Sequence, residues 1–422
     1  MNTRTGLALC ADIVSRGSEA YLVGGCVRDI VMESLGVIEN ANVHDVDIAT
    51  NMPIKELKGT YRTASNNGEA HGTILVEYGG VYFEVTQFRC DGSYSDGRHP
   101  DSVQFTPSFE EDTLRRDFTI NAMGLDHEGN VIDYNGGIND IKNNVVRTVG
   151  NPNERFSEDV LRIIRAVRFA ARFNFTIEDE TGIAMMINMA RLTGIARERI
   201  GDEIKKAASY GPVEFHNFLD ILTGYGLQSV IDPDIDWHSA RLYVKQYIDR
   251  TYGYFRKDDT VDISIEPELM MTFLFHGSAH LKQAIDSFRY DNKLYNMLKS
   301  VYSARGAMAE KPAESDEEQT QNGIVFDYMK ILDIVKSGYI DIYIAYTSTV
   351  NDVDPEIFDK QGILDLSFRY MTHSKALSAA VMDAGYSGKE FGIKLTEVTQ
   401  WFIKQTLDGS EPTDEQILNY FK

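Results

Sequence analysis

The sequence predicts an α+β protein, in which an N-terminal part that combines strands and helices is followed by a helical remainder. Up to residue 88, short apolar runs and alternating runs are separated by glycines, which is typical of strands joined by tight turns. From residue 156 onward, apolar residues recur at helical spacing. The chain has 422 residues, which is too many for one hydrophobic core, so we expect two or more domains.

The composition is that of a globular protein with a strongly acidic balance. Hydrophobic residues make up 43% of the chain and aromatic residues 11%, which is ample for burial. The net charge of −22 argues against non-specific coating of nucleic acid, so any nucleic-acid partner requires a local basic patch. The cysteines Cys10, Cys26 and Cys90 lack the spacing of a zinc site or a disulfide framework. The sequence has no apolar run of membrane-spanning length and no signal-peptide pattern, so we expect a cytoplasmic protein without membrane contact.

The first predicted elements are a helix, a buried strand, a tight turn and a second helix, over residues 1–20, Tyr21–Val23, Gly24-Gly25 and Val27–Leu35. A helix that begins on two glycines is typical of a phosphate-binding site. Backbone without Cβ atoms comes close to a polyphosphate, and the free N–H groups at the helix start point at the anion. Arg28 adds a fixed positive charge to this phosphate-binding site.

Two carboxylates follow this helix. Asp45 and Asp47 flank Val46, so on a strand both carboxylates face one side while Val46 and Ile48 face the core. Neighbouring carboxylates repel each other unless cations bridge them, and their hard oxygen ligands suit Mg²⁺. Each pattern alone is more often structural, as a turn or a solvated edge strand. The order strand, Gly-Gly, helix, carboxylate strand favours a two-metal nucleotidyl-transfer site.

The next predicted elements are a hairpin, a loop and a charged helix. The runs Gly72–Tyr78 and Val81–Phe88, joined by two glycines, predict the hairpin. Glu84 in the second run is either a third acidic group beside the metal pair or part of a solvated strand face. The pattern of residues 89–100 predicts a mobile loop, which beside an active site often acts as a lid. Arg116, in a dense acidic set, is either part of a surface salt-bridge helix or a triphosphate clamp.

Five ordered motifs resemble those of the class II tRNA nucleotidyltransferases, which are the CCA-adding enzymes of the polymerase β superfamily. The resemblance is strong to about residue 205 and weak after it. The matching segments are Tyr21–Asp29 with Asp45-Val-Asp47, Tyr94-Ser-Asp-Gly-Arg98, Arg115-Arg-Asp-Phe-Thr-Ile-Asn-Ala-Met123, Asp133 with Gly136-Gly137 and Asp140, and Glu158-Asp-Val-Leu-Arg-Ile-Ile-Arg-Ala-Val-Arg-Phe169 followed by Glu198-Arg-Ile200 and Glu203.

In the predicted helix after residue 156, Asp159, Arg162 and Arg165 recur at spacings of three and so share a face. A solvated salt bridge explains this spacing in most helices. The alternative is that Asp159 and Arg162 read the Watson–Crick edge of a base, since a carboxylate only accepts and a guanidinium only donates hydrogen bonds. Cytosine and adenine present an amine to the carboxylate and an acceptor to the arginine, whereas uracil and guanine present a carbonyl and an N–H. The resemblance favours this alternative.

The resemblance implies a nucleotidyltransferase head with a mixed β-sheet, followed by an all-α neck, body and tail. It implies addition of CCA to the 3′ end of tRNA from CTP and ATP, with Mg²⁺ as cofactor. Asp45 and Asp47 are the expected catalytic metal ligands. The predicted domains are a head over 1–150, a neck over 151–211, a body over 212–303, a loop or insertion over 304–323 and a tRNA-binding tail over 324–422. The expected nucleotide-binding residues are Gly24, Gly25, Arg28, Arg116, Asp159, Arg162, Arg165 and Arg168.

Three alternatives remain at this point: a bacterial-type poly(A) polymerase, a CC-adding enzyme and a catalytically silent tRNA-binding protein. The Tyr94–Arg98 loop and the presence of both metal carboxylates disfavour them. His99 stands where the family commonly has an arginine, and His71 where an aromatic residue is usual, which weakens the expectation for the loop. The sequence indicates no oligomeric state.

Overall fold

The computed structural model describes residues 2–421 except 42, 44, 65–68, 70–71, 93–102, 255–265, 279, 305–307, 311–319, 322–323, 327–330, 332–333, 336, 338, 352–359, 408–409 and 411. The chain divides into two compact units, Met1–His238 and Ser239–Lys422. The loop Tyr94–Arg98, His99 and His71 lie outside the described residues. In the part of the chain that is described, no helix is long and apolar enough to cross a membrane.

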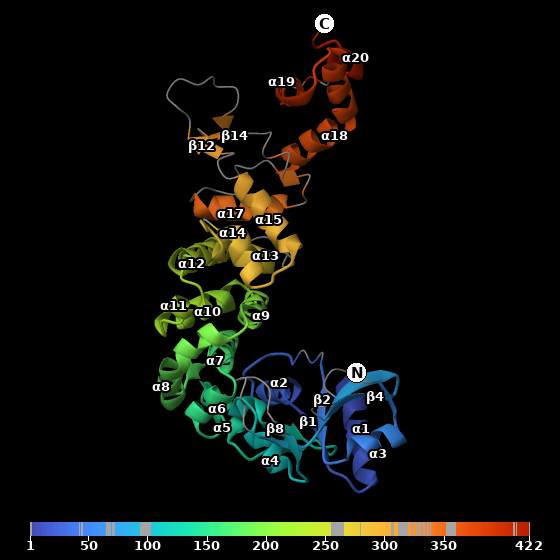
Figure 1. The fold of residues 1–422 in the computed structure, drawn as a ribbon, viewed down its shortest axis with the longest axis vertical. Helices are drawn as coiled ribbons and strands as arrows, with labels where there is room; N and C mark the ends of the chain where they lie inside the picture. Colours follow the sequence, from blue (N-terminus) through green and yellow to red (C-terminus); the bar gives the residue numbers. More distant parts are fainter. Residues whose placement is uncertain are drawn as a thin grey trace. The chain divides into compact units, whose positions relative to one another are not determined.

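A seven-stranded mixed sheet lies at the start of the first unit, as the sequence predicts (Figure 1). Strands β2 and β5 pair in parallel and the other neighbours are antiparallel. Leu22, Ile48 and Val85 stand in register across three adjacent strands and are fully buried, so they form one row of the core. In the order of the sheet, the strands are β3 (Arg62–Ala64), β4 (Thr73–Tyr78), β5 (Val81–Gln87), β2 (Asp47–Thr50), β1 (Ala20–Val23), β8 (Met123–Leu125) and β9 (Val131–Asp133).

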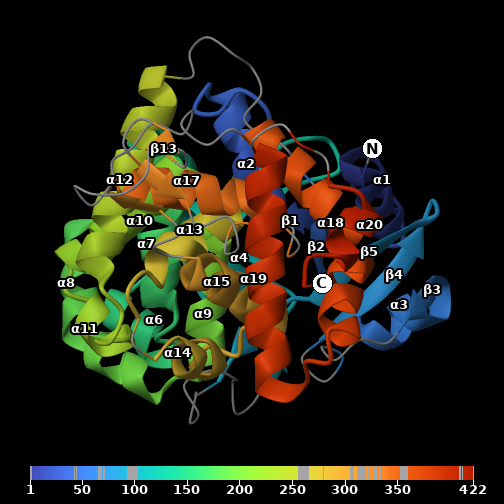
Figure 2. The ribbon, with the colours of Figure 1, turned by 90° about the horizontal axis from the view of Figure 1, so that it is seen from above.

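Short helices surround this sheet. Helix α1 (Asn2–Ser15) contacts β1, β4 and β5, and its Leu9 and Ile13 are fully buried. Helix α3 lies beside β3 and β4, which Figure 2 shows from above. The predicted hairpin is confirmed, and both turn glycines have positive φ, as a two-residue turn of this hand requires. The remaining elements here are α2 (Gly25–Ser34), α3 (Ile54–Thr60), β6 (Arg89–Asp91), β7 (Val103–Phe105), α4 (Phe109–Leu114), η2 (Thr119–Asn121) and α5 (Gly137–Lys142).

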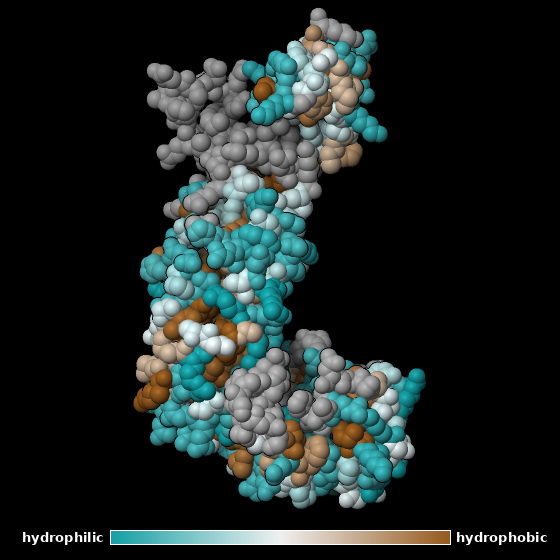
Figure 3. Space-filling view, in the orientation of Figure 1, coloured by the Kyte–Doolittle hydropathy of each residue, from teal (hydrophilic) through white to brown (hydrophobic). Residues whose placement is uncertain are grey.

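Helices complete the first unit. Helix α7 (Arg162–Phe173) is its centre, because it contacts both α9 and α10 and buries nine of its side chains. Three large apolar side chains on α8, Ile183, Met186 and Ile187, are at least half exposed, and Figure 3 shows hydrophobic surface over this part of the unit. The other elements are β10 (Val145–Val146), α6 (Pro152–Glu158), β11 (Thr176–Ile177), α8 (Asp179–Asn188), η3 (Met189–Gly194), α9 (Arg197–Ala208), α10 (Pro212–Gly224), α11 (Gln228–Ile231) and α12 (Trp237–Tyr254), which extends past the boundary between the units.

The second unit is mainly helical, as predicted. Near the C-terminus, α18, α19 and α20 enclose a core around Leu377, Val398 and Phe402. A three-stranded antiparallel sheet lies in and after the loop expected over 304–323, and the sequence pattern did not predict it. The elements are α13 (Glu266–Leu274), α14 (Leu281–Ser287), α15 (Asn292–Ser303), β12 (Met308–Glu310), β13 (Thr320–Gln321), β14 (Ile324–Phe326), α17 (Ile340–Val350), α18 (Lys360–Asp383), α19 (Gly388–Leu407) and α20 (Asp414–Leu418).

Candidate active site

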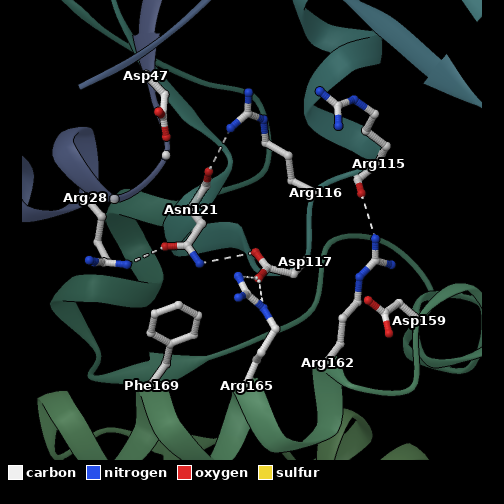
Figure 4. A pocket seen from close by; sticks show the side chains of 12 residues that line it. Arg28, Asp47, Arg115, Arg116, Asp117, Asn121, Asp159, Arg162, Arg165 and Phe169 are labelled. Atoms are coloured by element: carbon white, nitrogen blue, oxygen red, sulfur yellow. Dashed lines mark hydrogen bonds and ion pairs between the residues drawn. The ribbon is translucent and has the colours of Figure 1, made fainter. Parts of the chain in front are cut away.

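A pocket of about 440 Å³ opens between the sheet and α7 of the first unit (Figure 4). Eight of the ten predicted site residues line this pocket, whereas Asp45 and Arg168 do not. The lining residues are Gly24, Gly25, Arg28, Asp47, Arg115, Arg116, Asp117, Asn121, Asp159, Arg162, Arg165 and Phe169.

The turn between β1 and α2 forms one edge of the pocket. Gly24 has φ 75° and ψ −141°, which L side chains rarely adopt, and a Cβ there would lie 3.6 Å from Asp47 Oδ2. Helix α2 begins at Gly25, so its first N–H groups lie at this edge without partners from a preceding helical turn. The glycine pair therefore places a helix N-terminus beside a carboxylate.

The acidic edge of the pocket differs in one respect from the prediction. Strand β2 begins at Asp47, so Asp45 precedes the strand and does not lie on it. The alternation is nevertheless as expected, since Asp45 and Asp47 are exposed while Val46 and Ile48 are buried. Glu84 stands directly beside Asp47 in the parallel register of β2 and β5, and it too is exposed. The neighbour of the predicted pair on the sheet is therefore a third carboxylate.

Nearby positive charge does not fully balance the negative charge of Asp47 at this edge of the pocket. Its surface reaches solvent through the pocket, but protein atoms surround much of its carboxylate, and this burial raises its pKa. Repulsion from Glu84 and Asp45 raises the pKa further, while Arg116 opposes the shift. A divalent cation relieves such repulsion, so the donor set fits a hard metal ion.

The protein alone does not build a complete metal cage here. In the described part of the chain, no three His, Cys, Asp or Glu side chains converge closely enough to hold a metal ion. Mg²⁺ is usually bound by one or two carboxylates together with water and substrate phosphates. The acidic edge therefore fits a metal that arrives with a polyphosphate.

Two arginines lie near this edge in different states. Arg28 is 3% exposed, and its three guanidinium nitrogens all have partners: two contact Asp29 and one donates to Asn121 Oδ1 at 2.8 Å. Arg116 donates through Nη2 to Asp112 at 3.0 Å, but its buried Nε has no partner among the described residues. Arg116 lines the pocket, and its Nη1 makes only a long contact of 3.5 Å with the backbone oxygen of Asn121, so this nitrogen keeps donor capacity for an anion, whereas Arg28 supports the glycine turn.

The helical geometry predicted for Asp159 is wrong, although Asp159 does line the pocket. Helix α6 ends at Glu158, Asp159 follows it in an extended conformation (φ −143°, ψ 101°), and α7 begins only at Arg162. The two residues therefore do not share a helical face. Asp159 instead accepts from Arg199 Nη2 at 2.7 Å, and Arg162 donates to Glu158 at 2.6 Å and to the backbone of Arg115 at 3.0 Å. Each is fixed by other residues, and both still line the pocket.

Arg165 and Arg168 have different environments on α7. Arg165 lines the pocket and donates to Asp117 Oδ2 through Nε at 2.9 Å. Arg168 is 5% exposed and does not line the pocket; it donates to Glu203 and to the hydroxyl of Tyr210, both at 2.5 Å. Arg168 therefore stabilises α7, which forms one wall of the pocket, without itself reaching the pocket.

Four lining residues were not predicted from the sequence: Arg115, Asp117, Asn121 and Phe169. The first three belong to the motif Arg115–Met123, in which Arg116 alone was singled out. Burial alone would raise the pKa of Asp117, but the Arg165 guanidinium outweighs it and holds the pKa at about 2. The sequence did contain a signal for these residues, because polar residues within an apolar run are expected to be buried and to make polar contacts with other residues.

Comparison with known proteins decides the family. The sequence profile of the poly A polymerase head domain matches residues 20–147. The CCA-adding enzyme of Lactobacillus delbrueckii subsp. bulgaricus is 44% identical over 192 residues, which is 46% of this chain and 47% of that relative. The CCA-adding enzyme of Enterococcus faecalis is 38% identical over 288 residues, 68% of this chain and 66% of that relative. The chain belongs to the family of the CCA-adding enzymes. The match spans about half the length of the first of these relatives.

Solved structures share the fold of this CCA-adding family member. The crystal structure of the Bacillus stearothermophilus CCA-adding enzyme in complex with CTP matches with a TM-score of 0.73 and 23% identity, covering 99% of this chain and 96% of that one. A tRNA nucleotidyltransferase solved with a primer tRNA and an incoming ATP analogue matches with a TM-score of 0.61 and 22% identity, over 83% and 96% of the two chains. The predicted α+β class and the predicted family are thus confirmed. Nucleotidyltransferases of this family generally use divalent metal ions.

Proposed function

We propose that this chain adds C, C and A to the 3′ end of tRNA without a template, using CTP and ATP and releasing pyrophosphate. One observation carries the proposal: a single pocket holds the carboxylate Asp47, the glycine turn of α2, and the pair Asp159 and Arg162. The first two features suit a nucleoside triphosphate and its metal, and the pair suits a base edge. The CCA-adding relatives support the same interpretation.

In the proposed reaction, the tRNA 3′ hydroxyl attacks the α-phosphorus of the nucleotide. A new phosphodiester bond forms, the bond to the β-phosphate oxygen breaks, and pyrophosphate leaves as the hydroxyl loses its proton. Mg²⁺ held by Asp45 and Asp47 would lower the pKa of the hydroxyl and stabilise the departing pyrophosphate. The N–H groups at the start of α2 and the Nη1 of Arg116 would bind triphosphate oxygens. Arg28 would add positive charge beneath the turn.

The helical side of the pocket would select the base. The Asp159 carboxylate accepts from the amine of cytosine or adenine, and Arg162 donates to the ring acceptors of the same bases. Uracil or guanine would leave the carboxylate facing a carbonyl oxygen, which costs the free energy of an unpaired buried group. Arg165 and Arg168 would hold α7 in place. CTP and ATP would thus be accepted by one pair of side chains.

We further propose the domain division given by the sequence, with a head over 1–150, a neck over 151–211, a body over 212–303, an insertion over 304–323 and a tail over 324–422. Recognition of tRNA by its A-form shape would occur through the body and tail. The expected place of action is the cytoplasm.

The test is an incubation of the protein and Mg²⁺ with tRNA that lacks its 3′ end, supplying each nucleoside triphosphate in turn and then CTP with ATP. We expect two cytidines with CTP alone, and C, C and A with both. Long adenosine tails would instead support a poly(A) polymerase, and a product that stops after two cytidines when both nucleotides are present would support a CC-adding enzyme. No incorporation, with tRNA binding retained, would support a silent tRNA-binding protein.

A further inference from the structure

A chain of hydrogen bonds crosses the floor of the pocket from α2 to α7 (Figure 4). Arg28 Nη1 donates to Asn121 Oδ1 at 2.8 Å, and Asn121 Nδ2 donates to Asp117 Oδ1 at 3.2 Å. The other oxygen of Asp117 accepts from Arg165 on α7. Asn121 is 8% exposed, so water does not substitute for these bonds readily. The Asn121 carboxamide thereby joins α2 to α7, in addition to the cation–π contacts of Arg28 with Phe169 and Phe173 and the Asp29–Arg172 ion pair at 3.7 Å.

The orientation of this carboxamide is fixed by its partners. A guanidinium only donates and an ionised carboxylate only accepts, so Asn121 Oδ1 must face Arg28 and Nδ2 must face Asp117. Asp117 is ionised at neutral pH, since the Arg165 guanidinium holds its pKa at about 2. The backbone oxygen of Asn121 also accepts from Arg116 Nη1 at 3.5 Å. Asn121 therefore contacts both arginines on the phosphate side of the pocket.

We propose that Asn121 is a positioning residue, which together with Asp117 couples the fit of the base at α7 to the placement of the triphosphate at α2. This rests on the proposed function. A base that fits Arg162 holds α7, and the bonds from Arg165 through Asp117 and Asn121 then hold Arg28 beneath the glycine turn. A base that does not fit displaces α7, and this displacement also moves the glycine turn of α2 that binds the triphosphate. The base thus affects the chemical step as well as binding.

An exchange of the two side chains gives a sharp test. Asn121→Asp places two carboxylates side by side, and Asp117→Asn removes the charge that holds Arg165. The double variant Asp117→Asn/Asn121→Asp restores the chain of bonds with its middle link reversed. In it, the carboxylate at position 121 accepts from Arg28 and from the amide at position 117, whose oxygen accepts from Arg165. The backbone N–H of Phe118, which donates to Asp117 Oδ1 at 2.8 Å in the wild type, loses this acceptor in both variants that carry Asp117→Asn.

The matched control is Asn130→Asp. Asn130 donates to the Asp126 carboxylate at 2.9 Å, as Asn121 donates to Asp117, but it lies in an exposed turn that does not line the pocket. The substitution therefore creates the same pair of neighbouring carboxylates without touching either wall. Any effect common to Asn121→Asp and Asn130→Asp comes from added charge alone.

The measurement is kcat and KM for CTP and for UTP, with thermal unfolding recorded for every variant. We expect each single variant to reduce the ratio of kcat/KM for CTP over that for UTP by about tenfold, mainly through kcat, which lies within the roughly 5- to 150-fold range of coupling between sites. The double variant recovers most of the ratio, and Asn130→Asp leaves it unchanged. A loss of folded protein lowers both rates equally and cancels in the ratio.

An unchanged ratio in the single variants, or a double variant that does not recover it, overturns the coupling. If Asn121→Asp does not fold, Asp117→Asn and the double variant give the same comparison. Failure of the wild-type protein to add C or A to tRNA would overturn the proposed function instead, so the two failures are distinguishable.

Discussion

The two walls of the pocket differ in how their charges are matched. On the wall formed by the sheet, α2 and the segment after α4, Asp47 is repelled by Glu84 and Asp45, and Arg116 pairs with Asp112 through Nη2 alone. On the helical wall, Asp159 pairs with Arg199 and Arg162 pairs with Glu158. We propose that a metal and a polyphosphate complete the first wall, whereas ion pairs within the protein already hold the side chains of the second. A carboxylate repelled by its neighbours indicates a site for a cation, whereas a carboxylate paired with an arginine is held in a fixed position by the protein.

The largest expected effect is on the unmatched wall. Asp47→Asn should reduce nucleotide incorporation by about 1,000-fold or more, because metal-assisted charge stabilisation contributes several kcal/mol to lowering the barrier. The measurement is single-turnover incorporation at saturating Mg²⁺. Asp126→Asn, in an exposed turn, is the control and should leave the rate unchanged.

The same substitution should stabilise the protein in the absence of metal. The folded pKa of Asp47 is raised above its unfolded value, so its stability contribution is full below the unfolded pKa and is lost as pH rises through the folded pKa. Asn carries no such charge. Thermal unfolding in EDTA at roughly neutral pH should therefore show a higher midpoint for Asp47→Asn than for the wild type. An equal or lower midpoint would contradict the proposed imbalance of charge.

The next effect is on the matched wall. Asp159→Asn should lower kcat/KM for CTP by about 10- to 100-fold, because a charge-assisted hydrogen bond and the Arg199 pair are weakened. The amide also has a donor for the carbonyl of uracil, so relative use of UTP should rise. Competition between labelled CTP and UTP measures both changes. If CTP is still strongly preferred, the base is not recognised at this position.

A smaller effect is expected from Arg116→Lys. Lysine keeps the positive charge but lacks the planar fork, so KM for both CTP and ATP should rise by about tenfold with the preference between bases unchanged. Inorganic tripolyphosphate should lose inhibitory strength to the same extent. A change in base preference without a change in KM would place Arg116 on the other wall.

The last expected effect concerns stability and not activity, and it is the acid sensitivity that Asp117 contributes. Its folded pKa of about 2 is below the unfolded value of 3.8, so its stability contribution is present above the unfolded pKa and is lost as pH falls toward the folded one. The free energy of unfolding of the wild type relative to Asp117→Asn should shrink by about 2 kcal/mol between roughly pH 6 and pH 2.5, the span of this titration. A difference that does not vary with pH would contradict the Arg165 pairing.

Local patterns predicted the elements that depend on neighbouring residues. Alternation and paired glycines predicted the hairpin of β4 and β5, and Gly24 was predicted as a turn residue from its place between a strand and a helix. Spacing predicted a common face for Asp159 and Arg162, which is wrong because Asp159 lies at the end of α6 in extended conformation. Such a helix boundary depends on tertiary packing, which periodicity does not contain.

The side chains that complete the pocket depend on long-range contacts. Asn121 lies 93 positions from Arg28, and Asp117 lies 48 positions from Arg165. No local pattern connects residues so far apart, so the sequence identified Arg28 and Arg165 without the residues that hold them. The family was predicted from the resemblance of whole motifs, whereas the contacts between the motifs are seen only in the structure.

We propose above all that the helical wall of the pocket selects the base by means of two side chains, Asp159 and Arg162. The most direct test is single-turnover incorporation of CTP, ATP, UTP and GTP by the wild type and by the double variant Asp159→Ala/Arg162→Ala, at saturating Mg²⁺ and truncated tRNA. We expect the rates for CTP and ATP to fall to those for UTP and GTP, while inhibition by tripolyphosphate is retained. A double variant that still prefers CTP and ATP over UTP and GTP would contradict it.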